Sequence, residues 1–184
     1  MKKVILGLIL IPMVLLVGCS NNNESLTLAV EKELKSHYPQ FAKISLFGLK
    51  PINEDLFVVG FALQPINGEI QTGVKFVEKK GNRYIVKGGS NNSGSTKEII
   101  TFGKLETTIP PNNRSIEVFH GAIVNKNVYL VEIEINKHKT SQRVYGKKGY
   151  LFYFPQVHNN FIIRAYSKEK TKMFELKYPL EKQD

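Results

Sequence analysis

Beyond Pro39, apolar side chains recur with a period of two in short runs, and turn residues separate one run from the next. A period of two is typical of a β-strand with one buried and one exposed face. Alternating runs at 73–78 and 83–87 flank turn residues at 79–82, so we expect a hairpin there. The apolar run at 56–63 precedes that hairpin and extends it to an antiparallel meander.

One segment has helical periodicity instead. Four apolar residues recur every four positions before the proline: Leu26, Val30, Leu34 and Tyr38. Ser25 or Asn23 can cap the first turn, and Pro39 stops the last one. The pattern therefore predicts one amphipathic helix of about 13 residues.

A second block of strand-like runs follows the turn residues at 109–114. The runs are short: 115–124, 128–135, 143–145, 150–154, 161–166 and 171–176. Strands at this spacing favour a small β-sandwich. We expect an α+β fold with a helix on an antiparallel β-meander at 25–103, a link at 104–114 and a β-sandwich subdomain at 115–184.

Two segments depart from simple alternation. Residues 88–97 contain no apolar side chain, which predicts a mobile loop rather than a ligand clamp. Its first residues, Gly88-Gly89-Ser90, have the alternative of being held by backbone angles that only glycine adopts easily. Residues 150–154 are all large, which predicts a central sandwich strand with both faces covered; the alternative is an exposed aromatic patch.

The N-terminus has the pattern of an export signal. Two lysines precede an apolar run at 4–17 that is too short to span a bilayer comfortably, so residues 1–18 are predicted to be a signal peptide. Leu16, Val17 and Gly18 precede Cys19, the only cysteine in the chain. This segment resembles the bacterial lipobox. The alternative is a secretory signal that ends in cysteine by chance, or an uncleaved anchor helix.

The lipobox resemblance implies that a diacylglycerol is attached to the thiol of Cys19 and that the chain is cut before this residue. Residues 19–24 are then the lipidated cysteine and a polar tether. Two acyl chains are enough for stable membrane attachment. We therefore expect the mature protein to contact the membrane through this lipid, at the extracytoplasmic face of the cell membrane.

The mature chain is also similar to a group of small uncharacterised exported proteins of spore-forming Gram-positive bacteria. The similarity is carried by an aromatic strand that runs into Gly88-Gly89-Ser90, by the proline-containing link and by the hairpin at 163–169. Tyr84 stands where members of this group more often have Trp. The resemblance implies a fold and a compartment, and it implies no activity.

Residues that usually carry catalysis or bind metals are scattered. The four histidines form no pair with metal-binding spacing: His37, His120, His138 and His158. The only aspartates are Asp55 and Asp184, and no cysteine remains after lipidation to act as a nucleophile. Glu132 and Glu134 lie two apart, but they alternate with apolar residues, which favours a solvent-facing strand edge.

We therefore predict no catalytic residue, no cofactor and no metal, and we interpret the protein as a non-enzymatic binding or structural module of the cell envelope. The alternative is an envelope hydrolase or transferase with a site assembled from distant strands. A pocket that combines His120, Glu132 or His158 would favour this alternative.

Basic charge is the remaining signal. The net charge is +10, and it is +8 without Lys2 and Lys3 of the predicted signal peptide. We expect basic side chains to contact anionic lipid headgroups, an anionic wall polymer or an envelope protein. We do not expect nucleic acid as a partner, because the predicted location is outside the membrane. The alternative is that lysines at strand edges and turns prevent sheets from aggregating. The candidate contacts are Lys79, Lys80, Lys137, Lys139, Arg143, Lys147 and Lys148.

Overall fold

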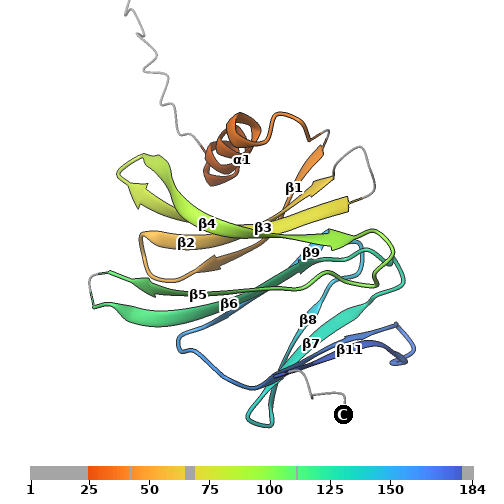
Figure 1. Ribbon diagram of the computed structural model, residues 1–184. Coiled ribbons are helices and arrows are strands. Elements are labelled where there is room, and N and C mark those ends of the chain that lie inside the picture. The colour runs from red at the N-terminus through yellow and green to blue at the C-terminus, as the bar shows by residue number, and fades with distance from the viewer. Residues whose placement is uncertain (1–24, 42, 65–68, 111, 180–184) are drawn as a thin grey trace, which may run out of the picture.

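The computed structural model describes residues 25–41, 43–64, 69–110 and 112–179, which form one helix and eleven strands (Figure 1). The predicted signal peptide at 1–18, with Leu16, Val17 and Gly18, lies outside the described residues, as does the tether at 19–24 with Cys19. Within the described ranges, no helix has the length and apolar character needed to cross a membrane.

The predicted helix is confirmed as α1, Leu26–His37. The side chain of Ser25 caps it by accepting a hydrogen bond from the backbone N–H of Leu28 at 3.2 Å. Val30 and Leu34 are fully buried, and they pack on one face of the first sheet. The helix ends at His37, directly before Tyr38-Pro39, because proline disfavours helical backbone in the residue that precedes it.

The predicted meander is also confirmed, within a first sheet of four antiparallel strands in the order β1-β2-β3-β4, of which β1 was not among the predicted runs. The strands are β1 Lys43–Pro51, β2 Leu56–Gln64, β3 Glu69–Lys80 and β4 Arg83–Ser95. Strand β2 is buried along most of its length, because α1 covers one face of this sheet and a second sheet covers the other.

Two further sheets complete the fold. The middle sheet has the order β5-β6-β9, with β5 Gly103–Ile109, β6 Arg114–Ala122 and β9 Gly149–Phe154. The outer sheet has the order β11-β10-β7-β8, with β7 Leu130–Ile135, β8 His138–Arg143, β10 Phe161–Tyr166 and β11 Lys172–Tyr178. The predicted link at 104–114 contains residues 104–109 of β5 and the first residue of β6, so most of it is strand.

The helix and the three sheets lie in successive layers, with the middle sheet between the other two (Figure 1). Val58 of the first sheet packs with Val118 and Leu151 of the middle sheet. On the opposite face of the middle sheet, Phe119 packs with Ile133 of the outer sheet. Apolar contacts therefore cross the boundary that the sequence predicted near 104–114.

Residues 150–154 were predicted to form a central strand, and the position of strand β9 differs from this prediction. The strand lies at an edge of its sheet rather than in the centre. Both of its faces are nevertheless covered: Leu151 points toward the first sheet and Tyr150 toward the outer sheet, and neither is exposed. The large side chains reflect the position of the whole sheet between two layers, not the position of the strand within the sheet.

The prediction of a mobile loop at 88–97 is also wrong, because residues 88–95 form the second half of β4. They pair with β3 from Gly88, opposite Phe76, to Ser95, opposite Glu69. A Cβ at Gly89 would overlap the carbonyl oxygen of Val74, so the backbones approach closely at this position. Backbone pairing therefore holds a strand that has no apolar side chain, and a prediction from side-chain burial does not detect such pairing.

Candidate functional site

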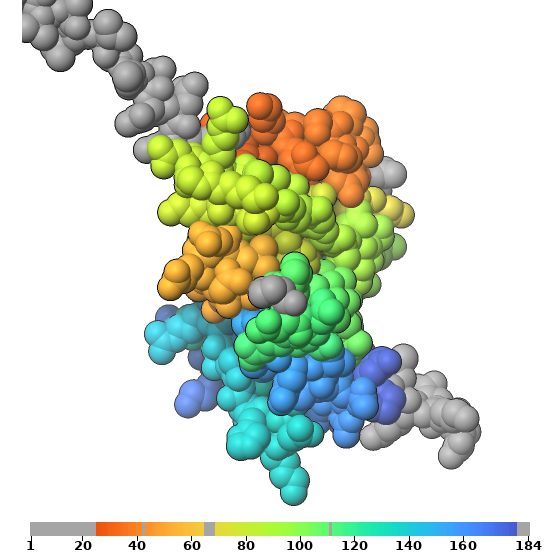
Figure 2. Space-filling view, turned by 90° about the vertical axis from the view of Figure 1, so that its left-hand side faces the viewer, coloured from red at the N-terminus to blue at the C-terminus, as the bar shows by residue number. Residues whose placement is uncertain are grey.

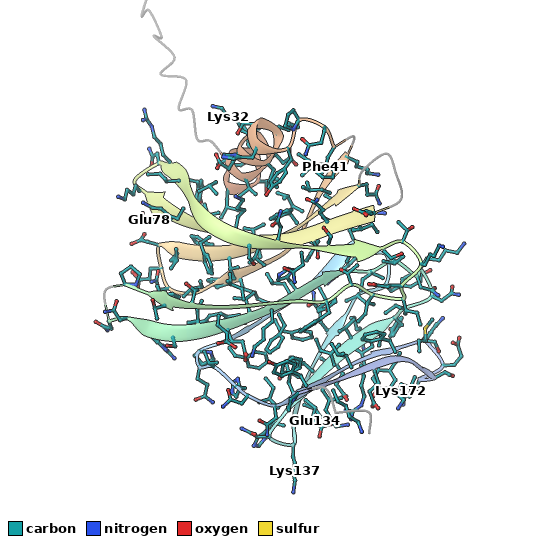
Figure 3. All side chains as sticks on the ribbon, viewed as in Figure 1. Lys32, Phe41, Glu78, Glu134, Lys137 and Lys172 are labelled. Carbon is teal, nitrogen blue, oxygen red and sulfur yellow. The ribbon has the colours of Figure 1, made fainter. Side chains whose placement is uncertain are left out.

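The predicted basic residues lie at separate parts of the surface. Lys79 and Lys80 end β3, whereas Lys137 and Lys139 lie in the β7–β8 hairpin. Figure 3 shows Lys137 at the tip of the outer sheet, far from Glu78 on the first sheet. Arg143 ends β8, and Lys147 and Lys148 follow it in the chain segment that leads to β9. The structure therefore does not bring the seven residues into one patch.

Some of these charges are paired with carboxylates. The ammonium of Lys80 lies 3.7 Å from a Glu78 oxygen that is also 2.8 Å from Lys87. Lys139 lies 3.2 Å from Glu132 and 3.9 Å from Glu134. Exposed pairs of this kind contribute little to stability, but they reduce the positive potential that a ligand meets.

Glu132 and Glu134 lie on the outer face of the outer sheet, as their alternation predicts, but they are not free carboxylates. Arg164 of β10 lies 2.6 Å from Glu134, 2.6 Å from Glu175 and 3.3 Å from Glu132. Its hydrogen bonds hold the pKa of Glu134 and the pKa of Glu175 below their usual values. The sequence pattern did not single out Arg164, which meets these glutamates only through strand pairing.

Lys147 and Lys148 lie elsewhere, with Lys126, along a groove of about 750 Å³ that we call the lysine groove. No aspartate or glutamate of the described residues lines it. The three ammonium groups form no ion pair within the described ranges. Positive charge in the lysine groove is therefore available to a ligand. Lys126, in the turn between β6 and β7, was not among the predicted contacts.

Apolar packing forms the floor of the lysine groove. Ala62 and Ile70 of the first sheet meet Ala122 at the end of β6, and all three are buried. On the other side, the backbone N–H of Val144 donates to the carbonyl of Tyr129 at 2.9 Å, which fixes the start of the loop that carries Lys147. Gly146 has φ +72°, a left-handed conformation that glycine adopts at little cost.

This turn exposes Tyr145, which retains 71% of its accessible surface beside the lysines. One face of its ring is near Tyr129, with ring centres 6.2 Å apart. The exposed ring therefore adds an apolar surface to the lining of the lysine groove. In the sequence Tyr145 follows the apolar residue Val144, and only the structure shows that its ring is exposed rather than buried.

A second groove, of about 1040 Å³, lies between the first sheet and β5, and we call it the edge groove. Its floor contains Leu56, Phe76 and Leu105, and β4 contributes residues 87–89. In Figure 2 the three segments that border it meet on the visible face: the β1–β2 turn in orange, β4 in yellow-green and the β5–β6 region in green. Lys80 is the one predicted basic residue that lines it.

The third feature is the Glu117 cluster, a group of ionisable side chains around a buried carboxylate, formed by Lys104, Glu106, Glu117 and His158. Glu117 on β6 is fully buried, and its two oxygens lie 2.7 Å from Lys104 Nζ and 2.8 Å from His158 Nδ1. Lys104 Nζ also lies 2.6 Å from Glu106 and 5.4 Å from the ring centres of Phe161 and Tyr178. The sequence patterns singled out His158 but not Glu117 or Lys104.

A histidine bound to a carboxylate is a component of many acid–base catalysts. Here, however, the Glu117 side chain has no exposed surface, and His158 lines neither the lysine groove nor the edge groove. The second ring nitrogen of His158 lies 3.0 Å from the Gln156 amide rather than beside a nucleophile. We interpret the Glu117 cluster as a structural connection between β5, β6 and the segment that precedes β10.

The residues that would indicate a hydrolase do not come together. Glu132 lies on the outer face of the outer sheet, and His158 lies in the Glu117 cluster. His120 is fully buried beside Asn92 of β4, and neither ring nitrogen has a hydrogen-bond partner in the described structure. Burial lowers the pKa of His120 to about 4, so the ring is neutral at pH 7.

The described residues contain no group of three histidine, cysteine or carboxylate side chains that is placed to hold a metal ion. No protein-family model matches this chain, and no curated protein or solved structure is similar to it. The lysine groove, the edge groove and the Glu117 cluster are therefore the features from which function is inferred.

Proposed function

We propose that this protein is a lipid-anchored, non-enzymatic binding module of the bacterial cell envelope, and that the lysine groove binds an anionic polymer or an acidic envelope protein. One observation carries this proposal. Lys126, Lys147 and Lys148 line one groove and make no ion pair within the described structure. Positive charges without partners raise the local concentration of anions and steer their approach.

The type of charge favours a repeating anion. Lysine carries a compact charge on a flexible stem, so it suits phosphate or carboxylate groups that vary in position along a polymer. Two of the three lysines are adjacent, and Lys126 comes from a different loop, so the groove offers charges at two separated points. The exposed ring of Tyr145 adds an apolar surface beside them.

The anchor determines which side of the protein is near the membrane. The tether at 20–24 reaches at most about 18 Å when fully extended. Helix α1 starts directly after it, at Leu26, so α1 and the first sheet stay close to the bilayer while the outer sheet points away. Metabolic labelling with an alkyne fatty acid tests the anchor: label in the wild type and none in Cys19→Ala is expected. Label that persists in Cys19→Ala contradicts it.

Binding to linear polyphosphate and to poly-glutamate tests the groove, with the full-length chain in detergent micelles. We expect Lys147→Gln with Lys148→Gln to raise the Kd at least about tenfold, at about 1 kcal/mol per lysine. Lys139→Gln is the matched control, because its ammonium contacts Glu132 and Glu134. An equal effect of both variants, or no binding of either polymer, contradicts the proposal.

We also infer that the middle and outer sheets act together as the small β-sandwich that the strand spacing predicts. Phe119 of β6, Val131 of β7 and Ile163 of β10 belong to one buried cluster, which supports this interpretation. Val128 and Val144 join the same cluster and also line the lysine groove. A sandwich would therefore supply the rigid support on which the lysine loops are held.

A further inference from the structure

The edge groove lies between two strands that each have one unpaired edge. Among the described strands, β4 ends the first sheet and pairs only with β3, and β5 begins the middle sheet and pairs only with β6. In the part of the chain that the structure describes, the backbone N–H and C=O groups on the other side of each strand have no sheet partner. Such an edge is a template for another extended chain. The groove runs along this edge of β5, with residues 105 and 107–109 in its wall.

Two adjacent glycines of β4 line the groove and differ in the space around them. A Cβ at Gly89 would overlap the carbonyl oxygen of Val74, so the packing requires glycine there. A Cβ at Gly88 would meet nothing within 4 Å, and the φ angle of this residue is not in the left-handed range. A Cβ at Gly88 would therefore lie in open space, at a residue that lines the groove.

The floor of the edge groove is apolar. Leu56, Phe76 and Leu105 are partly exposed there, and they pack against the buried cluster that contains Val58 and Ile116. An apolar side chain that entered the groove would extend this cluster and leave water. Because side chains of a strand alternate between two faces, every second residue of an added strand would reach the floor.

The charges of the groove favour a basic ligand. Lys80 and Lys87 lie at its rim, but both contact Glu78. Glu54 and Asp55, in the β1–β2 turn, make no ion pair in the part of the chain that the structure describes. The groove lining therefore carries three carboxylates against two ammonium groups, so its net charge is negative, which is the opposite of the lysine groove.

We propose that the edge groove binds an extended polypeptide segment, which adds as a strand to the free edge of β5. Alternate apolar side chains of the segment lie on the floor, and a lysine or arginine lies beside Glu54 and Asp55. Main-chain hydrogen bonds supply affinity in this mode, and the pockets for alternate side chains supply specificity. The site is separate from the lysine groove, and it selects a ligand of the opposite charge.

The probe is a dansyl-labelled peptide as long as β5, 7 residues, in which valine alternates with threonine and lysine. Fluorescence is measured with the full-length chain in detergent micelles. We expect binding that Gly88→Phe weakens at least about tenfold, because one valine side chain then loses its place on the floor. Ser93→Phe is the matched control: it adds the same ring on β4 at an exposed residue outside the groove.

Two further measurements test the mode of binding. Peptides N-methylated at every second residue, in both registers, lack the amide donors of one edge, and we expect at least one of them not to bind. Glu54→Gln with Asp55→Asn should weaken the lysine-containing peptide and leave a peptide with threonine in place of lysine unchanged. This second variant changes an exposed turn, so it keeps the test valid if Gly88→Phe does not fold.

Failure to bind the peptide overturns the proposal, and so does binding that neither Gly88→Phe nor the N-methyl groups affect. Binding of laurate that depends on Gly88, without binding of the peptide, also overturns it and identifies an acyl-chain site instead. Binding of polyphosphate is measured on the same variants and should not change with Gly88→Phe. The two grooves are thereby tested independently.

Discussion

The Glu117 cluster and the lysine groove both gather charged side chains, but they differ in burial and in pairing. Glu117 is fully buried, and Lys104 and His158 contact its two oxygens. Lys126, Lys147 and Lys148 are exposed, and no carboxylate of the described ranges pairs with them. A buried charge needs its partner for the fold to be stable, whereas an exposed unpaired charge is free to meet a ligand.

The largest expected effect is the removal of the buried carboxylate. Glu117→Ala leaves the ammonium of Lys104 beside aromatic rings without its buried partner, and we expect a loss of about 3 kcal/mol in the free energy of unfolding. Urea unfolding measures this loss. Glu106→Ala, which removes the more exposed partner of Lys104, is the control and should cost much less. Equal losses in both variants would break the contrast between buried and exposed charge.

His120 is a buried ionisable side chain without a hydrogen-bond partner in the described structure, so it shows the effect of burial alone on stability. Its pKa is lowered to about 4 in the folded protein, below the usual value of 6.5, so the unfolded chain binds more protons between these values. The free energy of unfolding should therefore rise with pH from about 4 to about 6.5, by up to about 3 kcal/mol, and stay level above. Urea unfolding of the wild type and of His120→Gln between pH 4 and pH 6.5 measures this rise. A slope that is identical in the variant contradicts this assignment.

Replacing the whole buried pair should cost less than breaking it. Lys104→Met with Glu117→Leu removes both charges and keeps apolar volume, so we expect stability within about 1 kcal/mol of the wild type. The double-mutant cycle with the two single variants then gives their coupling energy. A double variant as unstable as Glu117→Ala would mean that His158, and not Lys104, is the essential partner of Glu117.

The smallest stability effect is expected in the lysine groove. Glutamine at Lys126, Lys147 and Lys148 removes three charges that make no ion pair in the described structure. The free energy of unfolding should therefore change by no more than about 0.5 kcal/mol per site. Binding of polyphosphate should be lost in the same triple variant. A large loss of stability would show that these lysines support the fold, and the contrast with Glu117 would then fail.

Local patterns predicted the helix and the meander because both depend on the order of nearby residues. Ser25 caps α1, and the four-residue recurrence of Val30 and Leu34 places them on the buried face. The second half of β4 was not predictable in this way. Its stability comes from pairing with β3 and from the close approach at Gly89, and neither is visible in a run of polar side chains.

The candidate sites show the same division. Lys147 and Lys148 were predicted as basic contacts because basic residues cluster along that part of the chain, but Lys126 joins them only because the loop after β6 lies next to the loop after β8. Glu117 meets Lys104 through the pairing of β5 with β6, and it meets His158 across 41 positions of the chain. Contacts between distant segments have no periodicity in the sequence that would reveal them.

The sequence by itself determined the helix and its cap, the antiparallel character of the strands and the separation of alternating faces, because side-chain period and turn residues act over a few neighbours. Only the tertiary structure decided that the middle sheet is covered on both faces, that Lys104 and Glu117 are paired inside, and that no carboxylate of the described residues pairs with the three exposed lysines. The reason is physical: burial and charge pairing depend on which layers meet, and distant parts of the chain supply those layers.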